Sequence, residues 1–150
     1  MLPPPIIDAA KVVAFAIVGP DREFNAAKAL WVGDVRVGRV PKLAITEGSD
    51  ASDFLVLFCD EEWRSIAIVG AKSLDDAKHR ASAFYPDIQD AWQAAPYSQA
   101  DVERFIEAIY GTLRCSFCGR LPFEVAALFE VPSARICDTC IKQYRDQLDG

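Results

Sequence analysis

Four cysteines near the C-terminus stand in two pairs of the same spacing, Cys115-x2-Cys118 and Cys137-x2-Cys140, with 18 residues between the pairs. A gap of two residues lets both sulfurs of a pair reach one ion, and two pairs supply the four thiolates of a tetrahedral zinc site. Four thiolates leave no open position for water, so the metal is structural rather than catalytic. The pattern therefore predicts one structural Zn²⁺ per chain, bound by Cys115, Cys118, Cys137 and Cys140.

Other chemistry is open to four cysteines. Disulfides need an oxidising compartment, and the first residues, Met1 to Pro5, show no basic region followed by an apolar stretch as in a secretory signal. A thioredoxin-like redox site uses one Cys-x2-Cys pair rather than two. An iron–sulfur cluster could take the same four ligands, so zinc and iron–sulfur both stay open for the cell. We favour zinc and expect a cytoplasmic protein.

The charge of the chain limits its partners. The formal net charge is −6, and residues 1–110 carry 11 Lys and Arg against 17 Asp and Glu, while residues 111–150 carry 5 against 5. Metal binding deprotonates four thiols, so the neutral C-terminal segment would carry −2 once a divalent ion is bound. Such a surface attracts neither nucleic acid nor anionic lipid. The sequence also holds no apolar run long enough to span a membrane. We therefore expect neither nucleic acid nor a membrane as a partner.

The residues around the two cysteine pairs resemble a known zinc module, the N-terminal zinc-binding domain of ClpX, the unfoldase of the Clp protease. The resemblance covers residues 113–148 and rests on Cys115-Ser116-Phe117-Cys118-Gly119-Arg120, Glu124-Val125, Leu128, Pro132-Ser133 and Ile136-Cys137-Asp138-Thr139-Cys140-Ile141. It implies a treble-clef-like C4 zinc module that forms homodimers and docks substrates and adaptor proteins. No phosphate loop of the form G-x-x-x-x-G-K-[ST] occurs, so no nucleotide is expected.

Local patterns predict the path of the chain through this module. Gly119 can take the positive φ that ends a knuckle after Cys118. Residues 124–129 are interpreted as a short helix with Val125, Leu128 and Phe129 on its apolar side. Pro132 and Ser133 indicate a turn, and a last helix begins around Cys137 and runs toward Leu148. The positive end of that helix would favour thiolates in its first turn.

The first 110 residues predict an antiparallel α+β domain, so that the whole chain is expected to comprise domains at 1–110 and 111–150. Four to five antiparallel strands are expected among residues 12–18, 31–32, 35–37, 43–46, 54–59 and 63–69, with turns at Gly33-Asp34 and Asp60-Glu61-Glu62. Two helices follow. One is capped by Ser73 and stopped by Pro86, and the other is capped by Ser98 and ended by Gly111.

Residues 1–110 offer few candidates for catalysis. His79 is the only histidine, and between Lys78 and Arg80 on a helix it is typical of a solvated face. Cys59 ends an apolar strand and is typical of a buried small hydrophobe. The acids of Asp60-Glu61-Glu62 are usual in a turn, although they could seat a hard cation. We therefore predict a non-catalytic protein, with an enzyme housed in residues 1–110 as the alternative.

The function expected of the chain is recognition of another protein. Exposed apolar side chains near Phe117, Phe123 and Phe129 would meet a partner or a second copy of the chain on a scaffold fixed by zinc. Many C4 modules bind nucleic acid instead, so a zinc-dependent nucleic-acid-binding regulator is a second alternative, although it would need a basic face that the charge counts do not provide.

Overall fold

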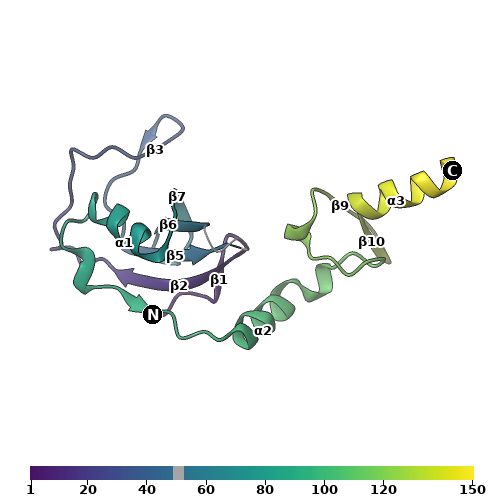
Figure 1. The fold of residues 1–150 in the computed structure, drawn as a ribbon, viewed down its shortest axis with the longest axis horizontal. Helices are drawn as coiled ribbons and strands as arrows, with labels where there is room; N and C mark the ends of the chain where they lie inside the picture. Colours follow the sequence, from purple (N-terminus) through teal and green to yellow (C-terminus); the bar gives the residue numbers. More distant parts are fainter. Residues whose placement is uncertain (49–52) are drawn as a thin grey trace. The chain divides into compact units, whose positions relative to one another are not determined.

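The computed structural model describes residues 1–48 and 53–150, and the chain divides into two compact units, Met1–Val102 and Glu103–Gly150. The division falls within helix α2 (Gln99–Tyr110), and the sequence analysis places a domain boundary at the end of the same helix. Each unit has a core of its own. Figure 1 shows the order of the elements along the chain.

The first unit is built on one antiparallel sheet, as the sequence predicts. Its order is β1-β2-β5-β6-β7, with β8 paired to β2. The bounds are Ile6–Ile7 for β1, Ala10–Ile17 for β2, Lys42–Glu47 for β5, Phe54–Cys59 for β6, Ser65–Ala71 for β7 and Gln93–Ala94 for β8. The sequence analysis anticipated the four longer strands but not β1 and β8, which are two residues long and too short for a hydrophobic pattern to mark.

A separate two-stranded hairpin leaves the sheet between β2 and β5. It consists of β3 (Trp31–Val32) and β4 (Val35–Arg36), which pair antiparallel. Gly33 has φ of 62°, in the region that glycine adopts without strain. The predicted hairpin at Gly33-Asp34 is confirmed.

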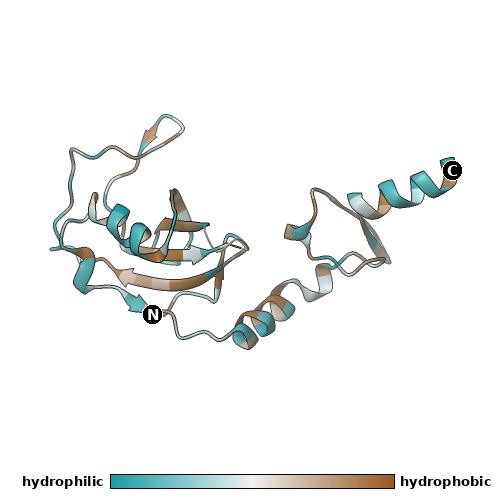
Figure 2. Cartoon of the chain, viewed as in Figure 1, coloured by the Kyte–Doolittle hydropathy of each residue, from teal (hydrophilic) through white to brown (hydrophobic). Residues whose placement is uncertain are grey.

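Side chains alternate across the main sheet and build a core on each of its faces. Val56 of β6 packs with Ala77 and Ala81 of helix α1 (Leu74–Ser82). The next residue, Leu57, packs with Phe15 on the opposite face. Strands β2, β5 and β6 are accordingly hydrophobic along most of their length, as Figure 2 shows. The fold class, α+β with an antiparallel sheet, is the one that the sequence predicts.

Both predicted helix caps are present. The Ser73 hydroxyl accepts a hydrogen bond from the Asp76 N–H at 3.0 Å, and the Asp76 carboxylate accepts one from the Arg80 guanidinium at 3.0 Å. At the start of α2, the Ser98 hydroxyl accepts from the Asp101 N–H at 3.1 Å, while the Asp101 carboxylate accepts from the Ser98 N–H at 2.9 Å. These contacts satisfy backbone groups that the first turn of a helix leaves without partners.

The second unit continues from α2 through a 3-10 turn at Gly111–Leu113 and a second one at Pro122–Glu124. An antiparallel hairpin of β9 (Leu128–Val131) and β10 (Ala134–Cys137) comes next, and helix α3 (Asp138–Asp149) ends the chain. A knuckle, a hairpin and a helix in this order form the treble-clef-like module that the resemblance implies. The turn at Pro132-Ser133 and the last helix are confirmed.

The short helix predicted over residues 124–129 is wrong. Only Pro122–Glu124 make a 3-10 turn, and Val125 is already extended, with φ of −132° and ψ of 156°. The N–H groups of Ala126 and Ala127 donate to the Asp138 carboxylate, a residue far along the chain, instead of to a helical carbonyl. This tertiary contact overrides the local helical pattern, and the following residues pair as β9.

Among the residues that the structure describes, no helix combines the length and the apolar character that crossing a bilayer requires.

Candidate metal centre

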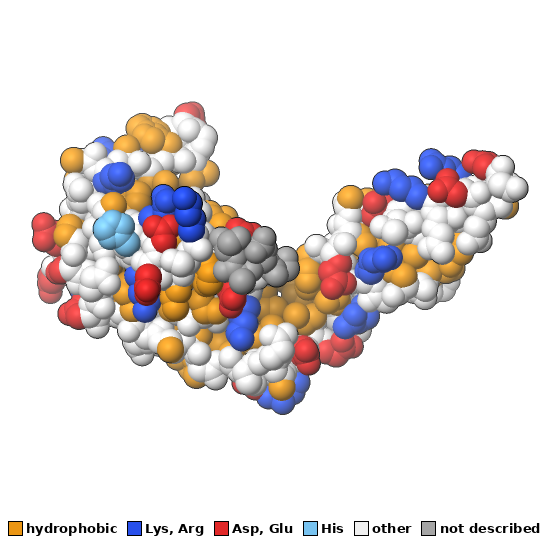
Figure 3. Space-filling model, viewed as in Figure 1, with side chains coloured by type: hydrophobic (Ala, Val, Ile, Leu, Met, Phe, Trp, Pro, Cys, Tyr) orange, Lys and Arg blue, Asp and Glu red, His pale blue; other side chains and the backbone are white. Residues whose placement is uncertain are grey.

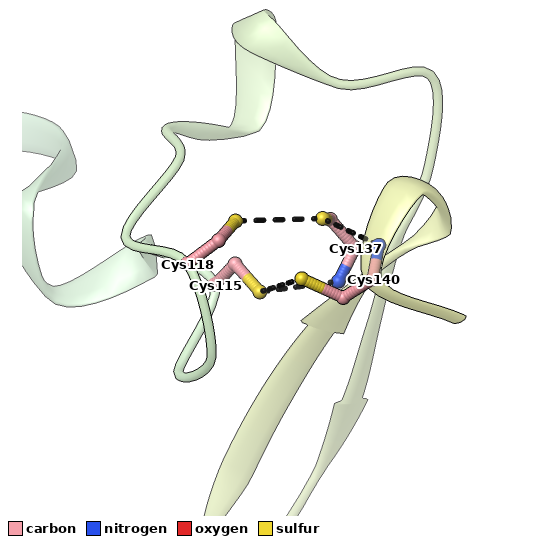
Figure 4. Close-up of side chains that lie close together, drawn as sticks. All are labelled: Cys115, Cys118, Cys137 and Cys140. Carbon is pink, nitrogen blue, oxygen red and sulfur yellow. Dashed lines mark hydrogen bonds between the residues drawn. The ribbon is translucent and has the colours of Figure 1, made fainter. Parts of the chain in front are cut away.

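The first cysteine pair lies on a knuckle closed by backbone hydrogen bonds. The Gly119 N–H donates to the Cys115 carbonyl at 2.9 Å, and the Cys115 N–H donates to the Arg120 carbonyl at 2.9 Å. Gly119 has φ of 77°, which an L side chain rarely adopts, so the glycine predicted to end the knuckle is required there. The turn brings Cys115 and Cys118 to one side of the loop (Figure 4).

The second pair lies where the hairpin meets the last helix. Cys137 is the final residue of β10 and the N-cap of α3, and Cys140 lies in the first helical turn. The Cys140 N–H donates to the Cys137 sulfur at 3.5 Å. Helix N-termini carry a partial positive charge, so the second pair lies at the end of α3 where negative ligands of a cation are accommodated.

The two pairs face one another across the module (Figure 4). All four sulfurs lie within 4.8 Å of one another. The Cys115 and Cys140 sulfurs are 3.9 Å apart, and those of Cys118 and Cys137 are 3.7 Å apart. A tetrahedral ion with Zn–S bonds of about 2.3 Å places its sulfurs about 3.8 Å apart. The four predicted ligands therefore form a closed tetrahedral donor set, and the module holds one structural Zn²⁺.

Protonation of the sulfurs shows why the ion is needed. Burial disfavours the Cys115 thiolate, but backbone N–H groups of Phe117, Cys118 and Cys137 donate to its sulfur and bring its pKa down to about 6. Burial and the neighbouring sulfurs raise the pKa of Cys140 to about 12. A thiolate at Cys140 is therefore disfavoured unless a cation lies between the sulfurs. Zinc binding therefore releases protons and supplies the charge that holds the cluster.

A second set of contacts ties the knuckle to the hairpin. The Ser116 N–H donates to the Arg135 carbonyl at 2.8 Å, and the Arg135 N–H donates to the Ser116 hydroxyl at 2.9 Å. The Arg135 guanidinium also donates to the Thr112 carbonyl at 2.7 Å and pairs with Glu130 at 2.9 Å. Strand β10 is thus bonded to β9 on one edge and to the knuckle on the other, which fixes the distance between the cysteine pairs.

An apolar groove of about 210 Å³ lies at the hairpin. It is lined by Phe129, Val131, Ala134 and Ile136 of the hairpin together with Phe117 and Arg135. The hairpin also contributes to the core around the metal centre, because Leu128, the register partner of Cys137, and Ile136 pack with the cysteines.

The three candidate interface residues lie in two places. Phe117 and Phe129 line the groove, and Phe117 also stacks edge-on against Tyr144 of α3 with ring centroids 5.8 Å apart. Phe123 instead stacks against Tyr110 at 5.4 Å and keeps 38% of its surface exposed.

Sequence reasoning missed the hairpin residues of the groove, Val131, Ala134 and Ile136. The alternation of apolar and polar residues across Phe129-Glu130-Val131, followed by Pro132-Ser133, could have revealed a hairpin. The interpretation of residues 124–129 as a helix obscured that signal.

The candidate catalytic residues of the first unit do not form a site. Cys59 is fully buried, and burial, followed by the charges of Asp8 and Asp60, raises its pKa to about 12. Its side chain lies in the core on one face of the sheet, whereas α1, which carries the exposed His79, packs on the other face.

The acidic turn has a structural use. The Asp60 carboxylate accepts hydrogen bonds from the Glu62 N–H at 2.8 Å and from the Arg64 N–H at 2.9 Å, which closes the turn between β6 and β7. Glu61 pairs with the Lys42 ammonium at 3.7 Å. Asp60 therefore fixes the shape of the turn, and the charge of Glu61 is balanced by Lys42.

Comparison with known proteins supports the identity of the second unit alone. No curated protein and no solved structure matches the chain. Residues 113–150, about a quarter of the chain, match the family model described as ClpX C4-type zinc finger. The match spans all four cysteines of the metal centre. Residues 113–150 of this chain are therefore similar to ClpX C4-type zinc fingers, which are structural and not catalytic domains.

Proposed function

We propose that the zinc finger of this chain docks a protein, and that zinc keeps its docking surface in shape. The observation that carries the proposal is the apolar groove lined by Phe117, Phe129 and Val131 at the hairpin. These three side chains keep 56%, 54% and 58% of their surface exposed. Clustered exposed apolar residues of this kind typically mark interaction sites, and aromatic residues are frequent anchors of interfaces.

The groove depends on the metal for its form. Its strands are joined to the zinc ligands directly, since Cys137 ends β10 and Ser116 of the knuckle bonds to Arg135. A unit of this size buries little core of its own, and the buried part consists of the cysteines packed with Val125, Leu128 and Ile136. Zinc binding therefore supplies most of the stability of the surface.

The partner we propose is a protein in the cytoplasm, either an adaptor or substrate of the kind that the ClpX resemblance implies, or a second copy of the chain. The chain as a whole would act by binding and not by catalysis. In support, the closed set of four cysteines leaves no position for water, and Cys59 and His79 lie on opposite faces of the first unit's sheet.

Nucleic acid is a weaker candidate partner. Residues 111–150 have equal numbers of basic and acidic residues before zinc binds, and Lys and Arg are interspersed with Asp and Glu on the face that Figure 3 shows. Binding to a phosphate backbone relies on concentrated positive charge and weakens steeply with salt. We expect no salt-sensitive binding to DNA or RNA.

Site-specific photocrosslinking in the source cell tests the proposal. A benzophenone amino acid placed at Val131 reports on the groove, and the same group at His79, exposed on α1, is the matched control. We expect a discrete crosslinked protein from position 131 only, and its loss when Phe129→Ser is added. Equal crosslinking from both positions, or persistence of the product in the Phe129→Ser chain, would contradict the proposal.

A further inference from the structure

The four zinc ligands differ in how far solvent reaches them. Cys115, Cys137 and Cys140 are buried, with 2%, 0% and 2% of their surface exposed. Cys118 is exposed. It lies on the knuckle, and its sulfur faces that of Cys137 at the helix cap (Figure 4). A small oxidant in solution therefore has better access to Cys118 than to the other three ligands.

A partner for a disulfide lies next to Cys118. The sulfur of Cys137 is 3.7 Å from the Cys118 sulfur. A sulfur atom at this distance can attack an oxidised Cys118.

We propose that Cys118 is an oxidation site through which peroxide opens the zinc centre, with Cys137 as the resolving cysteine. The inference concerns the chemistry of the metal ligands and does not rest on the docking function. When the ion leaves, the groove should be lost, and only the effect of this loss on docking rests on the proposed function.

The reaction has two steps. The Cys118 thiolate attacks one oxygen of hydrogen peroxide, the O–O bond breaks, and a sulfenic acid and hydroxide form. The Cys137 thiolate then attacks the Cys118 sulfur, an S–S bond forms, and a second hydroxide leaves. Two thiolates lose two electrons in total, and one peroxide is reduced to two hydroxides, which take up protons to become water. The ion loses two of its four ligands and is released.

The fifth cysteine provides an internal control. Cys59 is completely buried in the sheet, and burial is the main cause of the rise of its pKa to about 12. A buried thiol of this kind is inert toward peroxide. Selective oxidation at Cys118 thus contrasts with an unreactive Cys59 in the same molecule.

Peroxide titration of the full-length, zinc-loaded chain tests the proposal. Zinc release is followed with a chromophoric chelator, and cysteine modification is mapped by mass spectrometry. With peroxide below one equivalent, we expect Cys118 to be modified first, a Cys118–Cys137 disulfide to accumulate, and zinc release in proportion to the peroxide consumed. Reductant with added zinc should restore the centre. First modification at Cys115, Cys137, Cys140 or Cys59 would overturn the proposal, as would zinc retention after Cys118 is oxidised.

A ligand exchange sharpens the experiment. Cys118→His keeps four donors, because three cysteines and one histidine also make a structural zinc set. This variant lacks the exposed sulfur, and we expect its zinc release by peroxide to slow about tenfold. Cys59→Ser should release zinc at the wild-type rate. Release from Cys118→His as fast as from the wild type would refute the role of Cys118. If the variant fails to bind zinc, the order of modification in the wild-type chain decides the matter.

Discussion

Asp138 and Ala127 are joined by reciprocal hydrogen bonds, which connect the segment before β9 to the first turn of helix α3. The Asp138 N–H donates to the Ala127 carbonyl at 3.0 Å, and the Asp138 carboxylate accepts from the Ala127 N–H at 3.2 Å. The same carboxylate accepts from the Ala126 N–H at 3.1 Å. Because Asp138 directly follows Cys137, these bonds hold the helix that carries the second cysteine pair against the start of β9.

Replacing Asp138 with alanine should weaken zinc binding although the residue is not a ligand. The substitution removes the acceptor for two N–H groups and frees the segment before β9. Loss of a contact that orients metal ligands typically costs about 10- to 100-fold in metal affinity, and we expect the lower end because the Asp138 backbone bond stays. Competition with a chromophoric zinc chelator measures the change.

Asp138→Asn is the matched control, because its amide oxygen can still accept from Ala126 and Ala127. Its zinc affinity should lie closer to that of the wild type than to that of Asp138→Ala. Equal affinities for all three chains would show that the reciprocal bonds do not order the metal centre.

Cys137→Ser should unfold the second unit and leave the first intact. Cys137 is a ligand, caps α3 and ends β10, so its loss removes the ion and a structural junction together. The two units have separate cores, and the first has its own sheet. Amide hydrogen exchange should show loss of protection across residues 113–145 and unchanged protection in residues 1–100. Protection retained across 113–145 would mean that the unit folds without its metal.

The metal centre could be predicted from sequence because its signal is local and chemical. The spacing of the four cysteines identifies the ligands and also predicts tetrahedral coordination of the ion. Gly119 indicates the turn of the knuckle. The helix caps at Ser73 and Ser98 were predictable for the same reason, since each cap bonds to an aspartate three residues later.

The groove was harder to predict because it depends on contacts between distant residues. The N–H groups of Ala126 and Ala127 bond to Asp138, a contact between residues eleven and twelve positions apart that the local sequence pattern does not show. Strand β8 is similarly set by pairing of Ala94 with Ala14, eighty positions earlier in the chain. No pattern within two residues specifies such a strand.

Asp76 should make the stability of the first unit depend on pH in the acidic range. A hydrogen bond from the Lys72 N–H, followed by the Arg80 guanidinium, lowers the pKa of Asp76 below its ordinary 3.8. The folded state therefore favours the ionised carboxylate. Its stabilisation is present above the unfolded pKa of about 3.8 and is lost as the pH falls through the lower folded value.

Urea unfolding of the wild type and of Asp76→Asn at pH 6 and at pH 3 checks this expectation. The variant should be less stable at pH 6, and the difference between the two chains should shrink at pH 3. Asp75→Asn, an exposed position in the same helical turn, is the control and should show no comparable narrowing. A gap of constant size at both pH values would exclude a role for Asp76 ionisation.

Tyr85→Phe should lower the free energy of unfolding of the first unit, although the substitution removes only one oxygen atom. Tyr85 is fully buried, and its hydroxyl accepts a hydrogen bond from the Val40 N–H at 2.8 Å. Val40 itself is buried, so the variant leaves a backbone donor without a partner and out of reach of water. An unsatisfied buried donor costs about 1–3 kcal/mol, and we expect a loss of that size in the free energy of unfolding.

Tyr144→Phe is the matched control for this measurement. Tyr144 keeps 40% of its surface exposed, so water can replace any hydrogen bond that its hydroxyl loses, and its change should stay within about 0.5 kcal/mol. The ring of Tyr85 packs against Phe24 with centroids 5.2 Å apart, and phenylalanine preserves that contact. The predicted loss therefore isolates the hydroxyl. A Tyr85→Phe chain as stable as the wild type would mean that Val40 finds another acceptor, and that the loop entering β5 is not held by this bond.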